Sequence, residues 1–190
     1  MNLIKAHLQA GKGVVAIRTS SHGFSLGPRG KVPPGHVEWK DFDQEVLGHK
    51  YVRDLNNKSG TAISTLAHAN REQLLHGIKE NNFISGGSLY LVDNLKGNRV
   101  ILRGLVRING EPQLIPVAWS RSYQKSRVFY TSLGHVSDFD QHLATRMLVN
   151  AVYWTAKLPI PGYSSRSALN ESKERNKFDM KISGNDKVSE

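Results

Sequence analysis

The most constraining feature of this sequence is a run of four apolar residues, Val14–Ile17, that does not alternate with polar residues. A strand with one face in water alternates apolar and polar side chains, whereas a strand covered on both faces is continuously apolar. The run therefore predicts a strand of a parallel sheet with other elements packed on both sides. It ends abruptly at Arg18, where a polar cluster begins.

Further strands and helices alternate along the chain, which favours an α/β layered fold. Strands are expected at Thr61–Leu66, Ser88–Val92, Arg99–Ile108, Leu114–Trp119 and Arg127–Thr131. Short helices are expected before Gly11 or Gly13 and over Trp39–Leu47, with residues 49–61 as a loop. The first of these helices has one apolar face, made of Leu3, Ile4, His7 and Leu8.

The longest predicted helix opens at Ser137, which with Asp140 resembles a capping box. Its apolar face recurs at helical spacing: Phe139, Leu143, Met147, Ala151 and Trp154. Pro159 and Pro161 are expected to end it. We expect one domain over residues 1–158 and a polar, disordered tail over residues 159–190.

Composition excludes several classes of function. The 190 residues include no cysteine, so disulfides, thiolate zinc sites and cysteine nucleophiles are excluded. No run approaches the ~20 apolar residues of a membrane span, and the N-terminus has no apolar signal-peptide core, so no membrane partner is expected. The net charge is +10, but the basic residues are dispersed, and we expect neither a nucleic-acid partner nor a cofactor.

The polar cluster after the first strand is the first candidate site. It consists of Arg18, Thr19, Ser20, Ser21 and His22. Ligands of open α/β sheets bind beyond the carboxyl ends of the strands, and guanidinium, hydroxyl and imidazole groups suit a polyhydroxylated or anionic ligand. The alternative is structural: Ser20 and Ser21 would cap a helix, and His22 would bond to a nearby carbonyl.

A second candidate site follows the strand at Arg127–Thr131. There Gly134 permits a sharp turn and His135 stands just before a helix, where it could act as a general acid or base. Ser137 and Asp138 could orient it; the alternative is a structural hydrogen bond. A nucleophilic pair of Ser20 or Ser21 with His135 is a further alternative, although no G-x-S-x-G elbow is present.

A metal site is a further alternative, but its ligands follow no H-x-x-x-H spacing, and we expect none. The candidates would be His22, His36, His49, His68, His76, His135 and Asp138.

Four stretches together carry a family resemblance. They are GKGVVAIRTSSHGF (11–24), WKDFDQEVLGHKY (39–51), NFISGGSLYLV (82–92) and PVAWSRSYQKSRVFYTSLGHVSDFDQHLATRMLVNAVYW (116–154). They resemble the ThuA-like (trehalose-utilisation) family over residues 1–157. The resemblance implies a flavodoxin-like, three-layer α/β sandwich of the class I glutamine amidotransferase type. It also implies that the chain lacks the first two or three strands of the usual domain.

The resemblance also implies roles for residues. Arg18 stands where true amidotransferases have a nucleophilic cysteine, and because arginine stays protonated, glutaminase activity is not expected. A sugar-derived substrate is implied instead, with hydrolase-type chemistry. The expected catalytic residues are His135 and His22, and the expected substrate-binding residues are Arg18, Thr19, Ser20, Ser21, Tyr90 and Asp138.

The sequence departs from the family pattern in ways that favour a second interpretation. The glycine-containing turn before the last strand is Gln124–Arg127, and the family's His-Pro pair is Glu72-Gln73. Such losses suit a non-catalytic binding or scaffolding domain. In that case a second copy of the chain or another partner would cover the exposed edge of the sheet.

Overall fold

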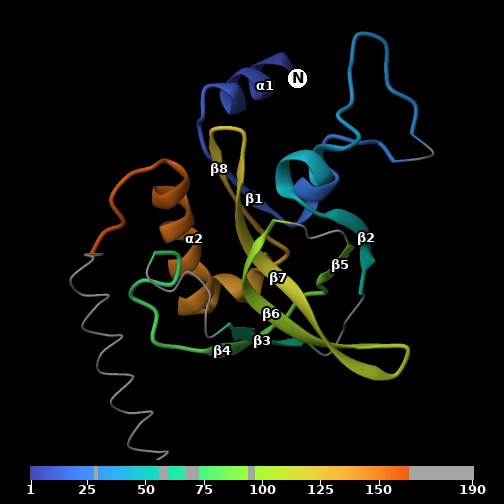
Figure 1. Ribbon diagram of the computed structural model, residues 1–190. Coiled ribbons are helices and arrows are strands. Elements are labelled where there is room, and N and C mark those ends of the chain that lie inside the picture. The colour runs from blue at the N-terminus through green and yellow to red at the C-terminus, as the bar shows by residue number, and fades with distance from the viewer. Residues whose placement is uncertain (28–29, 56–59, 67–72, 94–96, 163–190) are drawn as a thin grey trace, which may run out of the picture.

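A six-stranded mixed sheet forms the centre of the computed structural model, which describes residues 1–27, 30–55, 60–66, 73–93 and 97–162 (Figure 1). In spatial order its strands are β1 (Val14–Ile17), β8 (Ser126–Thr131), β7 (Glu111–Tyr123), β6 (Arg99–Ile108), β3 (Thr61–Thr65) and β4 (Asn82–Ser85). Only β1 and β8 pair in parallel, and the other neighbours are antiparallel. A smaller antiparallel sheet pairs β2 (Lys50–Asp54) with β5 (Tyr90–Asp93).

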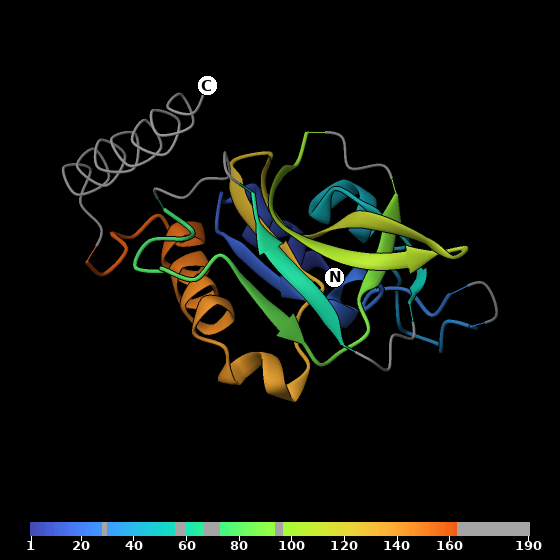
Figure 2. The same cartoon turned by 90° about the horizontal axis from the view of Figure 1, so that it is seen from below.

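Helical segments cover both faces of the sheet near β1 and β8. They are α1 (Asn2–Gln9), η1 (Arg18–Ser21), η2 (Asp43–Leu47), η3 (Val136–Asp140) and α2 (His142–Thr155). Helix α2 lies on one side, with α1 and η2 on the other (Figure 1). The hairpin of β6 and β7 extends away from α2 in both views (Figures 1 and 2). The arrangement is the layered α/β fold that the sequence predicted.

Two apolar cores, one on each face, explain the continuous apolar strands. In β8, Val128 and Tyr130 are buried with α1 and η2, whereas Phe129 is buried in the larger core with α2. In β1, Ala16 belongs to the first core and Val15 packs against the second. Successive side chains of a strand point to opposite faces, so both parities must be apolar here.

Strand β1 occupies an edge of the sheet rather than its centre. Within the described residues its one strand neighbour is β8. The apolar run correctly predicts that both faces of β1 are covered, but coverage of the faces says nothing about pairing along the edges. In the described part of the chain, both faces of β1 are therefore covered although the strand lies at an edge.

The long C-terminal helix differs from its prediction at its start. It begins at His142, and the preceding residues form the separate turn η3, capped by His135 instead of Ser137. Four of the five predicted apolar residues are buried: Leu143, Met147, Ala151 and Trp154. Phe139 lies on η3 and is half exposed, because the break between η3 and α2 turns it out of the helical face.

Other departures concern short or exposed elements. The predicted loop at residues 49–61 contains β2, whose side chains are mostly exposed and show no apolar alternation. Strand β4 was also not predicted. Leu3, expected on the buried face of α1, is almost fully exposed, whereas Leu8 is buried. Within the described residues, no helix has the length and apolar character that a bilayer crossing requires. The predicted tail falls mostly outside the described residues.

Candidate functional site at the β1–β8 rim

The ends of β1 and β8 place the two predicted polar segments at one rim of the sheet. The strands are parallel, and Ile17 is level with Thr131. The turn that follows β1 and the segment that follows β8 therefore emerge side by side. We call the surface formed by Arg18, His22, Gly87, Tyr90 and His135 the rim site.

The backbone of Arg18 makes the sharp turn with which the rim site begins. Its φ of 45° lies in the left-handed region, which is uncommon for a residue with a side chain. Two hydroxyl groups hold its carbonyl: the Ser21 Oγ donates to it over 3.1 Å and the Tyr130 Oη over 3.2 Å. Strain of this kind, on a sharp strand-to-helix turn, is typical of nucleophile elbows. Here the elbow presents a guanidinium.

The Arg18 guanidinium is fixed at the rim by contacts from two segments, Ser88–Tyr90 and the residue that follows β8, Ser132. Its Nη1 donates to the Ser88 carbonyl over 3.1 Å and to the Ser132 carbonyl over 3.5 Å. Its Cζ lies 5.3 Å from the centre of the Tyr90 ring, in cation–π contact. Within the described residues no hydrogen bond occupies Nε or Nη2. These groups keep a permanent positive charge and three N–H donors for a ligand.

His22 is exposed and stacks against two tyrosines. Its ring centre is 4.8 Å from that of Tyr51 and 5.8 Å from that of Tyr90. Its Nδ1 is 3.2 Å from the Ser21 Oγ. With the Ser21 proton donated to the Arg18 carbonyl, Nδ1 is the donor in this pair, and the lone pair of the neutral ring is then on Nε2.

His135 has the opposite tautomer. Its Nδ1 accepts the Ser137 N–H over 3.2 Å and lies 2.8 Å from the Ser137 Oγ. The neutral ring must then carry its proton on Nε2. Asp138 fixes the backbone of the same turn, since its Oδ2 accepts the N–H groups of Gly134 and His135 over 2.9 and 3.0 Å. In their neutral forms, His22 therefore offers a proton acceptor at Nε2 and His135 a proton donor at Nε2.

Two glycines allow the rim site to assemble. A Cβ on Gly87 would lie 2.8 Å from the His135 Cβ and 3.1 Å from the Arg18 Nη1, so Gly87 separates these two side chains. A Cβ on Gly134, where φ is 138°, would lie 2.8 Å from the Arg18 Cδ. Any larger residue would displace Arg18 or His135, which makes both positions part of the site.

The remaining predicted residues contribute differently. The Ser20 hydroxyl accepts the Ile17 N–H over 3.1 Å and donates to the Ile17 carbonyl over 2.9 Å, so it caps the turn. Ser21 is buried and contacts His22 rather than His135, so the structure does not form the alternative Ser–His135 pair. Thr19 is exposed, and Asp138 is buried beneath its turn. Their roles as ligand contacts stay predictions.

Sequence reasoning missed Tyr51 and Gly87. Tyr51 lies on β2, within the predicted loop. Burial, and then the nearby Asp54, raise the pKa of Tyr51, so its hydroxyl stays protonated near neutral pH. Gly87 lies in the stretch NFISGGSLYLV, which resembles the family. The glycine pair Gly86-Gly87 in this stretch was the sequence feature that could have indicated its role. Burial likewise raises the pKa of Tyr130.

No metal centre is built from the described residues, since none of their His, Asp and Glu side chains form a group of three able to hold an ion. His68 lies outside that part of the chain. His49 is completely buried against Trp119 and Tyr130, so its ring is not exposed as a metal ligand would be.

The fold and the rim site define a layered α/β domain with an arginine at the sharp turn after its edge strand β1. The chain belongs to the ThuA family, described as trehalose utilisation, whose family model matches residues 2–155. A search of the curated proteins finds no match to this chain.

Solved structures show the same fold. A ThuA-like protein of Bacteroides uniformis superposes with a TM-score of 0.55 at 16% identity, over 81% of this chain and 62% of that one. A ThuA-like protein of Parabacteroides merdae superposes with a TM-score of 0.52 at 16% identity, over 82% of this chain and 64% of that one. A cytoplasmic protein of Salmonella typhimurium superposes with a TM-score of 0.51 at 14% identity, over 82% of this chain and 59% of that one. This chain therefore spans less than two thirds of the length of these structures.

Proposed function

We propose that this ThuA-family domain binds a sugar-derived ligand at the rim site and that His22 and His135 take part in a hydrolysis there. The observation that carries the proposal is the Arg18 guanidinium, held at the rim by a left-handed elbow and by the carbonyl of Ser88. Sugars present several hydroxyl groups, and sugar acids add a carboxylate; both match the unoccupied N–H groups of Arg18. The description of the family, trehalose utilisation, supports the same class of ligand.

In the proposed reaction, the His22 Nε2 removes a proton from a water molecule as its oxygen attacks the substrate carbon. Negative charge develops on a substrate oxygen, and Arg18 and the His135 Nε2–H stabilise it by donating hydrogen bonds. The bond from carbon to the leaving oxygen then breaks, and His22 returns the proton to that oxygen. Arginine at the elbow supplies charge where a nucleophile would otherwise form a covalent intermediate, so we propose no glutaminase activity.

The binding step is tested by isothermal titration calorimetry with trehalose and glucuronate. Arg18→Gln should weaken binding by at least about tenfold, since a charged hydrogen bond is lost. Arg107→Gln is the matched control, because Arg107 donates to the Gly110 carbonyl in the β6–β7 hairpin. Equal binding by wild type and Arg18→Gln, or no binding of either sugar, would overturn the proposal.

The catalytic step is tested by release of acetate from 6-O-acetylglucose, a sugar ester whose carbonyl oxygen can carry the negative charge that the proposed reaction develops. His22→Gln and His135→Gln should each lose turnover and keep their folded circular dichroism spectrum. Sugar binding without turnover in the wild type would support the proposed binding site and overturn the proposed hydrolysis.

A non-catalytic scaffolding domain is the second candidate, and the position of β1 favours it. Within the described residues β1 pairs with β8 alone, so the backbone groups along its other edge could bind a strand of a second copy. Sedimentation equilibrium distinguishes this candidate, because it requires a dimer or larger assembly at micromolar concentration.

A further inference from the structure

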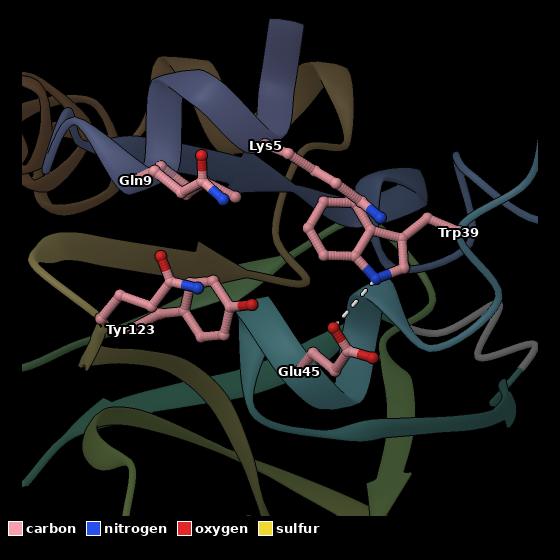
Figure 3. A pocket seen from close by; sticks show the side chains of 7 residues that line it. Lys5, Gln9, Trp39, Glu45 and Tyr123 are labelled. Carbon is pink, nitrogen blue, oxygen red and sulfur yellow. Dashed lines mark hydrogen bonds between the residues drawn. The ribbon is translucent and has the colours of Figure 1, made fainter. Parts of the chain in front are cut away.

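A pocket of about 210 Å³ lies away from the rim site, between α1, η2 and the β7–β8 turn (Figure 3). Its lining residues are Lys5, Leu8, Gln9, Trp39, Glu45, Tyr123 and Gln124. Tyr123 and Gln124 precede β8, whereas the rim site follows it, so the six residues of β8 separate this wall from the rim by roughly 20 Å. The Trp39 wall comes nearer, since the backbone N–H of Trp39 donates to the carbonyl of Phe24, two residues after His22. One small ligand that contacts Tyr123 therefore cannot also occupy the rim site.

The walls of this pocket are held in place before any ligand binds. The Trp39 Nε1 donates to the Glu45 Oε2 over 3.0 Å, and the Lys5 Nζ lies 5.1 Å from the centre of the Trp39 ring. Leu8 is buried, and the Ser126 Oγ donates to its carbonyl over 2.8 Å, which ties α1 to the start of β8. A preformed pocket loses little conformational entropy on binding.

The chemistry of the walls selects the class of ligand. Figure 3 shows Gln9, Trp39, Glu45 and Tyr123 arranged around one opening, with the Tyr123 hydroxyl directed into it. Two aromatic rings offer surface to the C–H groups of a ligand, and the phenol and amides exchange hydrogen bonds with hydroxyl groups. One cation, Lys5, and one anion, Glu45, line the pocket, so the lining carries no net charge that would select a charged ligand.

We propose that this pocket is a second binding site, for the single ring of a neutral sugar. Its volume is below the roughly 300 Å³ at which pockets for drug-sized ligands begin, which limits the ligand to about one ring. A zwitterion could also match Lys5 and Glu45. Both charges are exposed to solvent, however, where ion pairs contribute little, so the aromatic and amide groups favour the sugar.

The proposal is tested by nuclear magnetic resonance on the ¹⁵N-labelled chain, titrated with D-glucose and, separately, with the zwitterion glycylglycine. Glucose should shift the side-chain amide signals of Gln9 and Gln124 and the indole N–H signal of Trp39, and the shifts should saturate. Glycylglycine should not. Shifts with glycylglycine alone, no saturable shift with glucose, or glucose shifts confined to the rim site would each overturn the proposal.

Variants then separate this pocket from the rim site. Trp39→Ala should weaken the glucose response of Gln9 and Gln124 by at least about tenfold, as expected for loss of an aromatic contact, and Trp39→Phe by less. Tyr123→Phe should also weaken this response, because it removes the hydroxyl group directed into the pocket, and Tyr153→Phe, at a tyrosine on α2, is its control. Arg18→Gln should leave these signals unchanged even if it abolishes binding at the rim site. An unchanged response in a folded Trp39→Ala variant would refute the assignment.

Discussion

Acidification should destabilise this protein through one buried histidine, His49. Its side chain is fully buried, and within the described residues neither ring nitrogen has a hydrogen-bond partner. The ring packs against Trp119 and Tyr130, with ring centres 5.0 and 4.5 Å away. Burial, with a smaller contribution from the Arg121 charge and opposed by the Leu47 carbonyl, lowers the pKa of His49 from 6.5 to about 4.

The sign and size of the effect follow from linkage. The unfolded chain binds a proton at His49 more readily than the folded chain does, so the stabilisation is complete above pH 6.5. It is lost as the pH falls from 6.5 to about 4. A pKa difference of 2.5 corresponds to about 3 kcal/mol in the free energy of unfolding, of which about 2 kcal/mol is lost by pH 5.

Urea denaturation at intervals between pH 4 and pH 8 measures this loss. His49→Phe keeps a ring in the same space without a titrating group, so its stability should fall by about 3 kcal/mol less than that of the wild type over the same range. His36→Gln, which changes an exposed histidine, should retain the wild-type pH dependence. If His49→Phe and wild type lose stability in parallel, the free-energy cost of protonating His49 in the folded state is not what burial implies.

Two further predictions concern the core and the rim site. Met147→Ala should lower the free energy of unfolding by about 2–5 kcal/mol, because the Met147 side chain is fully buried beneath α2. Val149→Ala, at a position of the same helix that is 44% exposed, should lower it far less. Equal losses of stability in urea denaturation would contradict the assignment of this face of α2 to the core. Asp138→Ala should cost about 1–3 kcal/mol, because two backbone N–H groups lose their acceptor, and it should weaken sugar binding at the rim site as well. An Asp138→Ala variant that melts at the wild-type temperature would show that the η3 turn does not depend on this carboxylate.

Much of the fold follows from local pattern. The apolar runs predict β1 and β6 with their observed bounds, and the helical spacing predicts the buried face of α2. These elements are long or fully covered, so the burial of each side chain leaves a clear period in the sequence. Strand β2 leaves no such trace, because most of its side chains are exposed. The start of α2 was misplaced because Asp138 accepts hydrogen bonds from the turn before the helix.

The rim site was only partly predictable, for a different reason. Arg18, His22 and His135 follow strands that end at one rim, so their approach follows from the parallel pairing of β1 and β8. Gly87 and Tyr51 come from the distant β2 and β5 regions, and their contacts with His135 and His22 are set by tertiary packing. Tautomers also require coordinates, since they depend on which atoms lie within hydrogen-bonding distance.

The edge position of β1 has a geometric consequence for any assembly of this chain. Two copies related by a twofold axis and joined along β1 would run these strands in opposite directions, merging two six-stranded sheets into one. The carboxyl ends of the two β1 strands would then point to opposite ends of the merged sheet. The two Arg18 charges would be kept apart, and each copy would meet its ligand independently of the other.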